Sequence, residues 1–588
     1  MVVYRKMMRI GLKSLFLWAV LSVLAGCTGH RDGVTFRIVA TSDVHGLVFD
    51  TDCVTGTERS GSLAKFSSFL KKQRKEYSNV IYLDAGDMLQ GSVEMYQDLT
   101  AQFVRHSLAA EALNLLGCDA MVMGNHDFAV GANSYDRFFK GLKFPLLGAN
   151  VFFEQYGDYM TPYRIIDVRG LKVAVIGFTT PIINYTIPRD MMELELAPVV
   201  EAARHWMPVL KEKADVVVGL IHSGLDGGRS DNGDIYENNV RRLVAEVPGF
   251  NLIIYGHDHV ARCIKTADCN GDSVLLLNPG PFAMNAAVAT VNVRSDESGN
   301  PVILTSGSIE DITDEVADNR YMKKLSGWYD DVCNYSDSVI GSVSDAFDCS
   351  GILWRGSSMM DYVHGFQMKH NGAQVSLTSP AFRKQSIPSG DLQIRDLFDL
   401  YRFDNTMVAV MMKGSEVKDI LEYSAGLFYN TVTDGNGPLL RYVVGEDGVK
   451  TPEQSVNRLI TAAGIDYVID VTKPAGERVT ILSFTDGSVF DPDAYYRTTV
   501  NSFLFGGTDA LQKATGLTIM DMQKRLVSSS MADIRYYMLT NLALSREAGR
   551  PVTVRPLSSG RLIPEDIVSD CLKRDTIHFS VLKTEALW

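Results

Sequence analysis

Short runs of apolar, mostly β-branched residues recur along the first half of this chain, and each run leads into a polar cluster and then a helical stretch. The runs show no polar alternation, which is typical of strands covered on both faces. Strands that alternate with helices indicate an α/β layered domain. Seven such runs lie at residues 36–39, 80–83, 121–123, 173–176, 216–221, 252–254 and 274–277.

The polar clusters at the ends of these runs are rich in Asp, His and Asn. In an open α/β sheet the carboxyl ends of the strands share one edge, where ligands bind. We therefore expect side chains from distant parts of the chain to meet at one rim of the sheet. The clusters contain Asp43 and His45, then Asp87, then Asn125 and His126, then His222, and finally His257 and His259.

This mixture of side chains predicts a metal centre. Imidazole, carboxylate and amide oxygen together favour Zn, Mn, Fe or similar divalent ions over Ca. A shared carboxylate can hold two cations ~3.5–4 Å apart, the spacing that clamps both sides of an in-line phosphoryl displacement. A single Asp after a strand is more often a helix cap, so the prediction depends on the whole ordered set.

In this order the clusters resemble the motifs of the calcineurin-like metallophosphoesterases, D-x-H, G-D, G-N-H-[DE], H and G-H-x-H. The resemblance implies a four-layer α/β sandwich with two metal ions, in which His126 protonates the leaving oxygen. Asp127, beside it, is the second candidate catalytic residue. Ala129 stands where 5'-nucleotidases carry the Asp that orients this His, so His126 lacks that partner, and Asp127 is no certain replacement for it. The implied ligands are Asp43, His45, Asp87 and His259 for one ion, and Asp87, Asn125, His222 and His257 for the other.

The length of 588 residues is too great for one hydrophobic core, so at least two domains are expected. The first, at 34–314, carries the metal motifs. Residues 315–335 are charged and predict a connecting helix, which suggests a hinge. A second α/β or α+β domain follows at 336–545, and no structure is predicted for 546–588.

The second domain resembles the nucleoside-binding domain of the two-domain 5'-nucleotidase family. Segments 379–383, 399–406 and 464–474 are nearest to the branch that acts as 2',3'-cyclic-nucleotide 2'-phosphodiesterase and 3'-nucleotidase. The resemblance implies that Phe403 and Phe503 sandwich the base, since stacking tolerates any base, and that Asn405 contacts the base edge. The alternatives are core packing for both Phe residues and a turn role for Asn405.

The first 27 residues predict an export signal. A basic region precedes an apolar run at 15–24, and the run ends in Leu24-Ala25-Gly26-Cys27. This ending resembles the bacterial lipoprotein signal, in which Cys27 is lipidated and anchors the protein to a membrane, facing the periplasm or the outside. The alternative is a signal peptide that is cleaved to release a soluble protein.

Charge and cysteine content limit the partners. The formal net charge of −13 becomes −17 without the four basic residues of the signal, and such an acidic surface repels nucleic acid polymers. A small phosphate ester can still bind where metal ions supply positive charge. Besides Cys27 there are seven cysteines, of which Cys263 and Cys269 are close enough in sequence for a local disulfide.

Together these features predict a dinuclear-metal phosphoesterase that hydrolyses nucleotide phosphate esters outside the inner membrane, with 2',3'-cyclic and 3'-phosphates favoured. Within the enzyme class, the alternative is a 5'-nucleotidase. The alternative from another class is a surface lipoprotein that binds nucleotides without cleaving them, and the complete ligand set argues against it.

Overall fold

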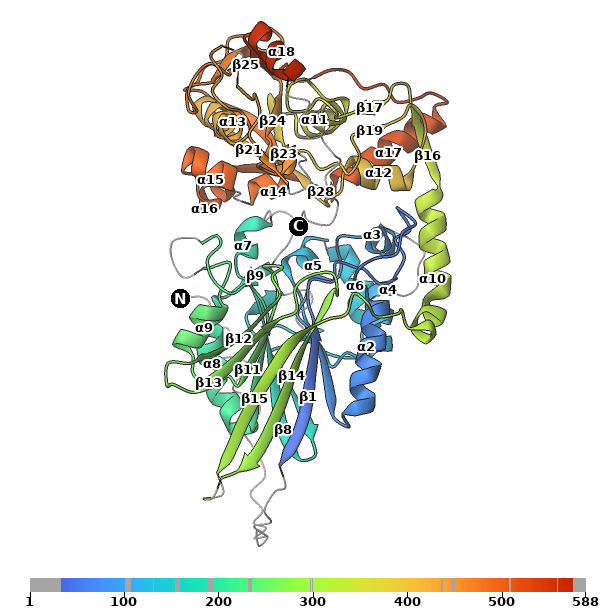
Figure 1. Cartoon of the computed structure of the whole chain (residues 1–588), viewed down its shortest axis with the longest axis vertical. Helices are drawn as coiled ribbons and strands as arrows, with labels where there is room; N and C mark the ends of the chain where they lie inside the picture. Colours follow the sequence, from blue (N-terminus) through green and yellow to red (C-terminus); the bar gives the residue numbers. More distant parts are fainter. Residues whose placement is uncertain are drawn as a thin grey trace.

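The computed structural model describes residues 33–574, apart from 101–106, 131, 154–158, 188–193, 231–234, 297, 299, 435–436, 446–449, 507–508 and 558. The predicted signal and Cys27 lie outside the described residues. Two domains are visible in Figure 1, and the long helix α10 (Asn319–Asp337) connects them along one side. We call the part before α10 the metal domain and the part after it the C-terminal domain.

Two sheets packed face to face form the centre of the metal domain. One sheet has the spatial order β15 (Pro301–Asp311), β14 (Asn285–Ser295), β1 (Val34–Thr41), β2 (Val80–Asp84), β3 (Ala120–Val122), β4 (Leu146–Leu147) and β6 (Met160–Thr161). The other has the order β12 (Arg262–Ala267), β13 (Ser273–Asn278), β11 (Leu252–Tyr255), β10 (Val216–His222), β8 (Leu171–Thr179) and β7 (Tyr163–Val168).

The strands are apolar on both faces because each sheet is covered on both sides. In β1, Ile38 points into the core between the sheets, whereas Val39 points into the outer core beneath the helices. In β8, Val175 faces inward and Ile176 packs under α8 (Val199–Lys213) and α9 (Val240–Glu246). Helices α2 (Leu63–Glu76) and α4 (Leu108–Leu116) cover the first sheet. The predicted four-layer α/β sandwich is confirmed.

A five-stranded sheet organises the C-terminal domain, in the order β24 (Thr461–Ala463), β18 (Val375–Thr378), β27 (Tyr495–Asn501), β21 (Thr406–Lys413) and β28 (Leu526–Asp533). Helix α13 (Gly414–Phe428) packs on one face, where Val408 and Val410 of β21 meet it. Met407 points to the opposite face, toward α11 (Ser358–Asn371) and α17 (Ile534–Glu547). This domain is also α/β, as predicted.

The segment after residue 545, for which no structure was predicted, belongs to the C-terminal domain as far as it is described. Strand β29 (Arg561–Ile563) pairs in parallel with β25 (Ile465–Asp470), and α18 (Glu565–Arg574) packs beside it. The backbone N–H of Val552 donates to Ser342 at 2.8 Å, near the start of the domain. The described part of this segment is therefore packed into the C-terminal domain.

The cysteine prediction is wrong. Cys263 and Cys269 are free and exposed, and the disulfide joins Cys53, in the loop region after β1, to Cys333 of α10. Strand β12 begins at Arg262 and ends at Ala267, so an extended chain of about 3.3 Å per residue carries the two predicted partners apart. Within the described residues, no helix combines the length and the apolar composition that crossing a membrane requires.

Candidate metal centre

The predicted metal ligands meet at one end of the two sheets, in loops that follow the central strands. Asp43 and His45 follow β1, Asp87 follows β2, and Asn125 begins the short helix α5 (Asn125–Ala129) after β3. His222 is the last residue of β10, and His257 and His259 follow β11. The convergence expected from the strand pattern is therefore present in the structure.

Five of the seven predicted ligands have backbone conformations that ordinary residues rarely adopt. The φ angles of Asp43, His45, Asp87, His257 and His259 lie between 51° and 81°. A left-handed conformation of a non-glycine residue costs on the order of 1–3 kcal/mol and persists where surrounding contacts enforce it. The strain indicates that these side chains are held in position for a function.

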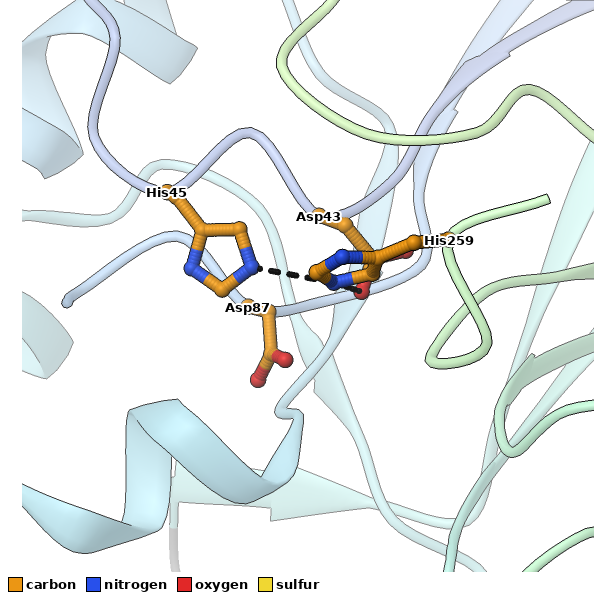
Figure 2. Close-up of side chains that lie close together, drawn as sticks. All are labelled: Asp43, His45, Asp87 and His259. Carbon is orange, nitrogen blue, oxygen red and sulfur yellow. Dashed lines mark hydrogen bonds and ion pairs between the residues drawn. The ribbon is translucent and has the colours of Figure 1, made fainter. Parts of the chain in front are cut away.

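The first group contains Asp43, His45, His259 and Asp87, whose ligand atoms lie within 4.8 Å of one another. Figure 2 shows a ring nitrogen of His45 directed at His259, whose ring in turn meets the carboxylate of Asp43. The Nε2 atoms of His45 and His259 are 3.2 Å apart, and Nε2 of His259 lies 3.3 Å from Oδ1 of Asp43.

The second group shares Asp87 with the first. Nε2 of His222 lies 3.2 Å from Oδ2 of Asp87 and 3.1 Å from Oδ1 of Asn125. The amide oxygen of Asn125 is also 2.8 Å from Nδ1 of His257. The structure thus brings together all seven predicted ligands in two adjoining groups with one common carboxylate.

Hydrogen bonds outside the groups show which ring nitrogens can bind a cation. Nδ1 of His45 lies 2.9 Å from the carbonyl oxygen of Gln90, and Nδ1 of His222 lies 2.8 Å from that of Ala85. A carbonyl oxygen only accepts, so each Nδ1 carries a hydrogen, and Nε2 is the ring nitrogen left to bind a cation. Nε2 of His222 faces the Asp87 carboxylate and the Asn125 amide oxygen, and Nε2 of His45 faces Nε2 of His259, an arrangement that fits divalent cations.

Burial and neighbouring charges tune the two groups differently. Burial lowers the pKa of His45 to about 3, which keeps its ring neutral. Burial opposes the charge on Asp43, but the hydrogen bond from His259 and the charges of His222 and His259 together outweigh it, and the pKa of Asp43 falls to about 2. Burial likewise opposes the charge on His222, yet the adjacent Asp87 carboxylate raises the pKa of His222 to about 10. A strongly anionic pocket around Asp87 therefore attracts positive charge.

Two glycines permit the close approach of the loops. A Cβ atom at Gly124 would lie 2.1 Å from Oδ1 of Asp87, and one at Gly256 would lie 1.8 Å from Oγ of Ser42. Any side chain at either position would displace the ligands. Gly124 and Gly256 are thus required because a side chain at either position would collide with the carboxylate of Asp87 or of Asp43.

His126 lies at the edge of the metal centre, and its neighbour Asp127 points away from it. The ring of His126 is 5.1 Å from that of His45 between centroids, and its backbone N–H donates to Oδ1 of Asp87 at 2.8 Å. The buried carboxylate of Asp127 accepts backbone N–H groups of Gly124, Asp87, Met88 and Leu89 at 2.7–2.8 Å. Both oxygens of Asp127 therefore fix the ligand loops in this structure, and its catalytic role stays a prediction.

Three residues around the centre were missed in the sequence. Oε1 of Gln90 lies 2.5 Å from Nδ1 of His126. Oε1 of Glu237 lies 3.2 Å from Nε2 of His257, and Arg229 pairs with the same carboxylate. Burial opposes the charge of Glu237, but His257 and Arg229 hold the pKa of Glu237 well below its usual value. None of the three stands in a recognisable motif, although Gln90 follows Asp87 by only three residues.

A cavity of about 920 Å³ between the two domains opens onto the metal centre. The predicted substrate residues Phe403, Asn405 and Phe503 line it from the C-terminal domain, opposite His126. Phe503 is 57% exposed, which excludes plain core packing, whereas Phe403 is half-buried and packs against the apolar core. The Asn405 side chain donates to the Tyr401 hydroxyl at 3.1 Å and accepts from Ser502 at 3.3 Å.

Comparisons with known proteins give the same two-part organisation. Residues 36–261 match the calcineurin-like phosphoesterase family, and residues 339–516 match the 5'-nucleotidase C-terminal domain. The chain is 28% identical to a 2',3'-cyclic-nucleotide 2'-phosphodiesterase/3'-nucleotidase of Salmonella typhimurium over 84% of either chain.

Two further relatives extend this result. The trifunctional nucleotide phosphoesterase of Bacillus subtilis is 26% identical over 90% of this chain, which spans only 39% of that longer protein. A Staphylococcus aureus crystal structure named as a 5'-nucleotidase covers 90% of this chain and 100% of its own, with a TM-score of 0.69 and 19% identity. The chain therefore belongs to the two-domain 5'-nucleotidase family, with a calcineurin-like metallophosphoesterase domain and a 5'-nucleotidase C-terminal domain.

Proposed function

We propose that this protein hydrolyses phosphate esters of nucleosides, with 2',3'-cyclic and 3'-phosphates preferred. The observation that carries the proposal is the meeting of seven donor side chains around the shared Asp87, at the floor of a cavity lined by Phe403 and Phe503. The first group of side chains suits one divalent cation and the second group another. Residues 34–314 would form the metallophosphoesterase domain and residues 336–545 the substrate domain, joined by a linker at 315–335.

The side chains have separate tasks in this reaction. Bound divalent cations supply positive charge against the phosphate and lower the pKa of a bound water toward ~7. Asn125, at the start of α5, would stabilise charge that develops on the phosphate oxygens. His126, at the edge of the metal centre, donates a proton to the ribose oxygen as the P–O bond breaks.

The C-terminal domain would recognise the nucleoside. Stacking of a base on Phe503 and Phe403 is worth ~1–3 kcal/mol per base by alanine substitution and tolerates every base. Asn405 already bonds to Tyr401 and Ser502, so its proposed contact with the base edge would use the remaining hydrogen-bonding capacity of its amide.

The preference for cyclic and 3'-phosphates is supported by the segments at 379–383 and 464–474 and by the relative from Salmonella typhimurium, which is similar along both domains. The 5'-nucleotidase alternative draws support from 5'-nucleotidases among the relatives, such as that of Mus musculus, 24% identical over 82% of this chain. Turnover of 2',3'-cyclic AMP, 3'-AMP and 5'-AMP in one buffer, with and without a chelator, separates the two. We expect 5'-AMP to be the slowest, and a faster rate on 5'-AMP would reverse the preference.

The non-catalytic alternative is not favoured, because a binding protein needs neither strained ligands nor a proton donor at the cavity floor. Isothermal titration with 3'-AMP and a phosphate-release assay on the same metal-loaded sample test it. Binding without release of phosphate would support the alternative.

We further propose that the protein is exported and anchored through a lipid on Cys27. The signal pattern at 1–27 supports this, and the disulfide between Cys53 and Cys333 suits an oxidising compartment. Cys27→Ser should move the protein from the membrane fraction to the soluble fraction after export. An unchanged membrane fraction for Cys27→Ser would contradict the anchor.

A further inference from the structure

Gln90 lies between His126, the proposed proton donor, and the C-terminal domain. It follows Asp87 in the loop after β2, and only 8% of the residue is exposed. Its Oε1 atom lies 2.5 Å from Nδ1 of His126, and its Nε2 atom lies 3.4 Å from the backbone oxygen of Asp404. The side chain of Gln90 therefore bridges the two domains across the cavity.

The contact with Asp404 defines which end of the Gln90 amide faces His126. A backbone oxygen only accepts, so the NH₂ group of Gln90 points to Asp404 and the amide oxygen points to His126. That oxygen in turn only accepts, so Nδ1 of His126 carries a hydrogen. Nε2 of His126 is then the nitrogen that exchanges a proton with the substrate.

Further contacts fix both the main chain of Gln90 and its partner Asp404. The backbone oxygen of Gln90 accepts from Nδ1 of His45, so a metal ligand fixes the main chain at this position. Asp404 forms an ion pair with Arg535, which is fully buried. The guanidinium of Arg535 also lies 4.2 Å from the ring centroid of Phe398, so the Asp404 loop is packed as well as paired.

We propose that Gln90 is the positioning residue of His126, in place of the Asp that is replaced here by Ala129. Gln90 accepts the Nδ1 hydrogen of His126 and thereby directs Nε2 toward the substrate. As the P–O bond breaks, its electron pair goes to the leaving oxygen, which takes the Nε2 proton of His126, while water supplies the oxygen gained by phosphorus. The proposal rests on the proposed function only in naming the ribose oxygen as the leaving group.

The test compares leaving groups, because a good leaving group needs no proton. Gln90→Met removes the amide but keeps the length of the side chain. We expect kcat on 3'-AMP to fall by about ten- to hundredfold, less than the ~10²–10⁴ that proton transfer itself contributes, because His126 is still present. Turnover of p-nitrophenyl phosphate should change by less than about threefold, since p-nitrophenolate leaves unaided. Metal content, measured by mass spectrometry, should stay at the wild-type level.

Two further variants serve as controls. Gln90→Glu keeps an oxygen that accepts from Nδ1, and it should recover most of the kcat lost in Gln90→Met. Gln97→Met removes a similar contact elsewhere, because Nε2 of Gln97 donates to the backbone oxygen of Asp331 at 3.2 Å. Gln97 lies in α3 (Val93–Thr100), outside the cavity lining, so this variant should keep wild-type turnover.

The outcomes separate this proposal from the proposed function. Equal losses of kcat on 3'-AMP and p-nitrophenyl phosphate, or an unchanged kcat on 3'-AMP, would overturn the positioning role. If the wild-type enzyme cleaves aryl phosphates but no nucleotide, the proposed function fails, and phenyl phosphate replaces 3'-AMP as the ester with the poor leaving group. A selective loss on phenyl phosphate in Gln90→Met would then still support Gln90 as the positioning residue.

Discussion

The two walls of the cavity differ in how tightly their side chains are held. In the metal domain, Asp43, His45 and His222 are fully buried or nearly so, and further contacts fix their orientation. In the C-terminal domain, more than half of Phe503 is exposed, and Phe403 is only partly buried. Bond cleavage requires groups in one geometry, whereas a stacking surface works over a range of positions. Substitutions in the first wall should therefore affect every substrate, and those in the second only nucleotides.

The largest effect is expected for Asp87→Ala, because Asp87 belongs to both groups of ligands. Metal and activity should be lost together, with turnover reduced on nucleotides and aryl phosphates alike. Metal analysis and initial rates on 3'-AMP and p-nitrophenyl phosphate measure both quantities. Full activity in this variant would refute the shared role of Asp87.

A smaller loss is expected for His126→Ala, which removes the proton donor without removing a ligand. Turnover of 3'-AMP should fall by ~10²–10⁴, the usual contribution of proton transfer, while metal content stays near normal. Stopped assays on purified, metal-analysed protein provide the measurement. If the variant loses its metal, His126 belongs with the ligands and the distinction fails.

On the opposite wall, Phe503→Ala should raise KM for 3'-AMP by about five- to hundredfold, because stacking is worth ~1–3 kcal/mol. The rate on p-nitrophenyl phosphate should not change, and neither should thermal stability, since the ring is largely exposed. Steady-state kinetics on the two substrates are the test. Equal losses on both would mean that Phe503 supports the fold of the cavity and not the nucleoside.

The smallest effect concerns stability, through His364 in the core of the C-terminal domain. Nδ1 of His364 lies 2.8 Å from Oγ of Ser376, and burial lowers the pKa of His364 to about 3. The folded state therefore binds a proton on His364 less readily than the unfolded state does. The free energy of unfolding is retained above pH ~6.5 and falls as the pH drops toward about 3. Each pH unit in that window costs up to about 1.4 kcal/mol.

Urea unfolding of the wild type and of His364→Gln at pH 7.5 and 5.0 measures this contribution. The loss of stability between the two pH values should be smaller in the variant by up to about 2 kcal/mol. Turnover of 3'-AMP at pH 7.5 should remain unchanged. The same pH dependence in both proteins would show that His364 does not titrate in this range.

The sequence was most informative where chemistry and topology coincide. His222 and His257 could be assigned to one rim because each follows an apolar run, and parallel strands bring their carboxyl ends together. Glu237 lies after the 231–234 segment, and its contact with His257 depends on tertiary packing that no local pattern records. The same holds for β29, whose three residues become a strand only by pairing with β25.

Asp127 shows a different limit of sequence reasoning. Its position beside His126 made it a candidate for catalysis, yet a helix turns successive side chains in different directions, and at the start of α5 the two diverge. The carboxylate of Asp127 accepts hydrogen bonds from backbone N–H groups of two loops, at Gly124 and at Met88. The motif therefore includes this residue for loop geometry.

The disulfide between Cys53 and Cys333 restricts where the C-terminal domain can pivot. It fastens α10 to the metal domain near the end of the helix, and Oγ of Ser336 adds a bond to the Cys53 backbone oxygen at 3.0 Å. Of the 19 residues of α10, only the last four lie beyond Cys333. Helix α10 is thus fixed to the metal domain as far as Ser336, and any movement of the C-terminal domain that admits substrate must bend the chain between Ser336 and β16 (Val339–Val343).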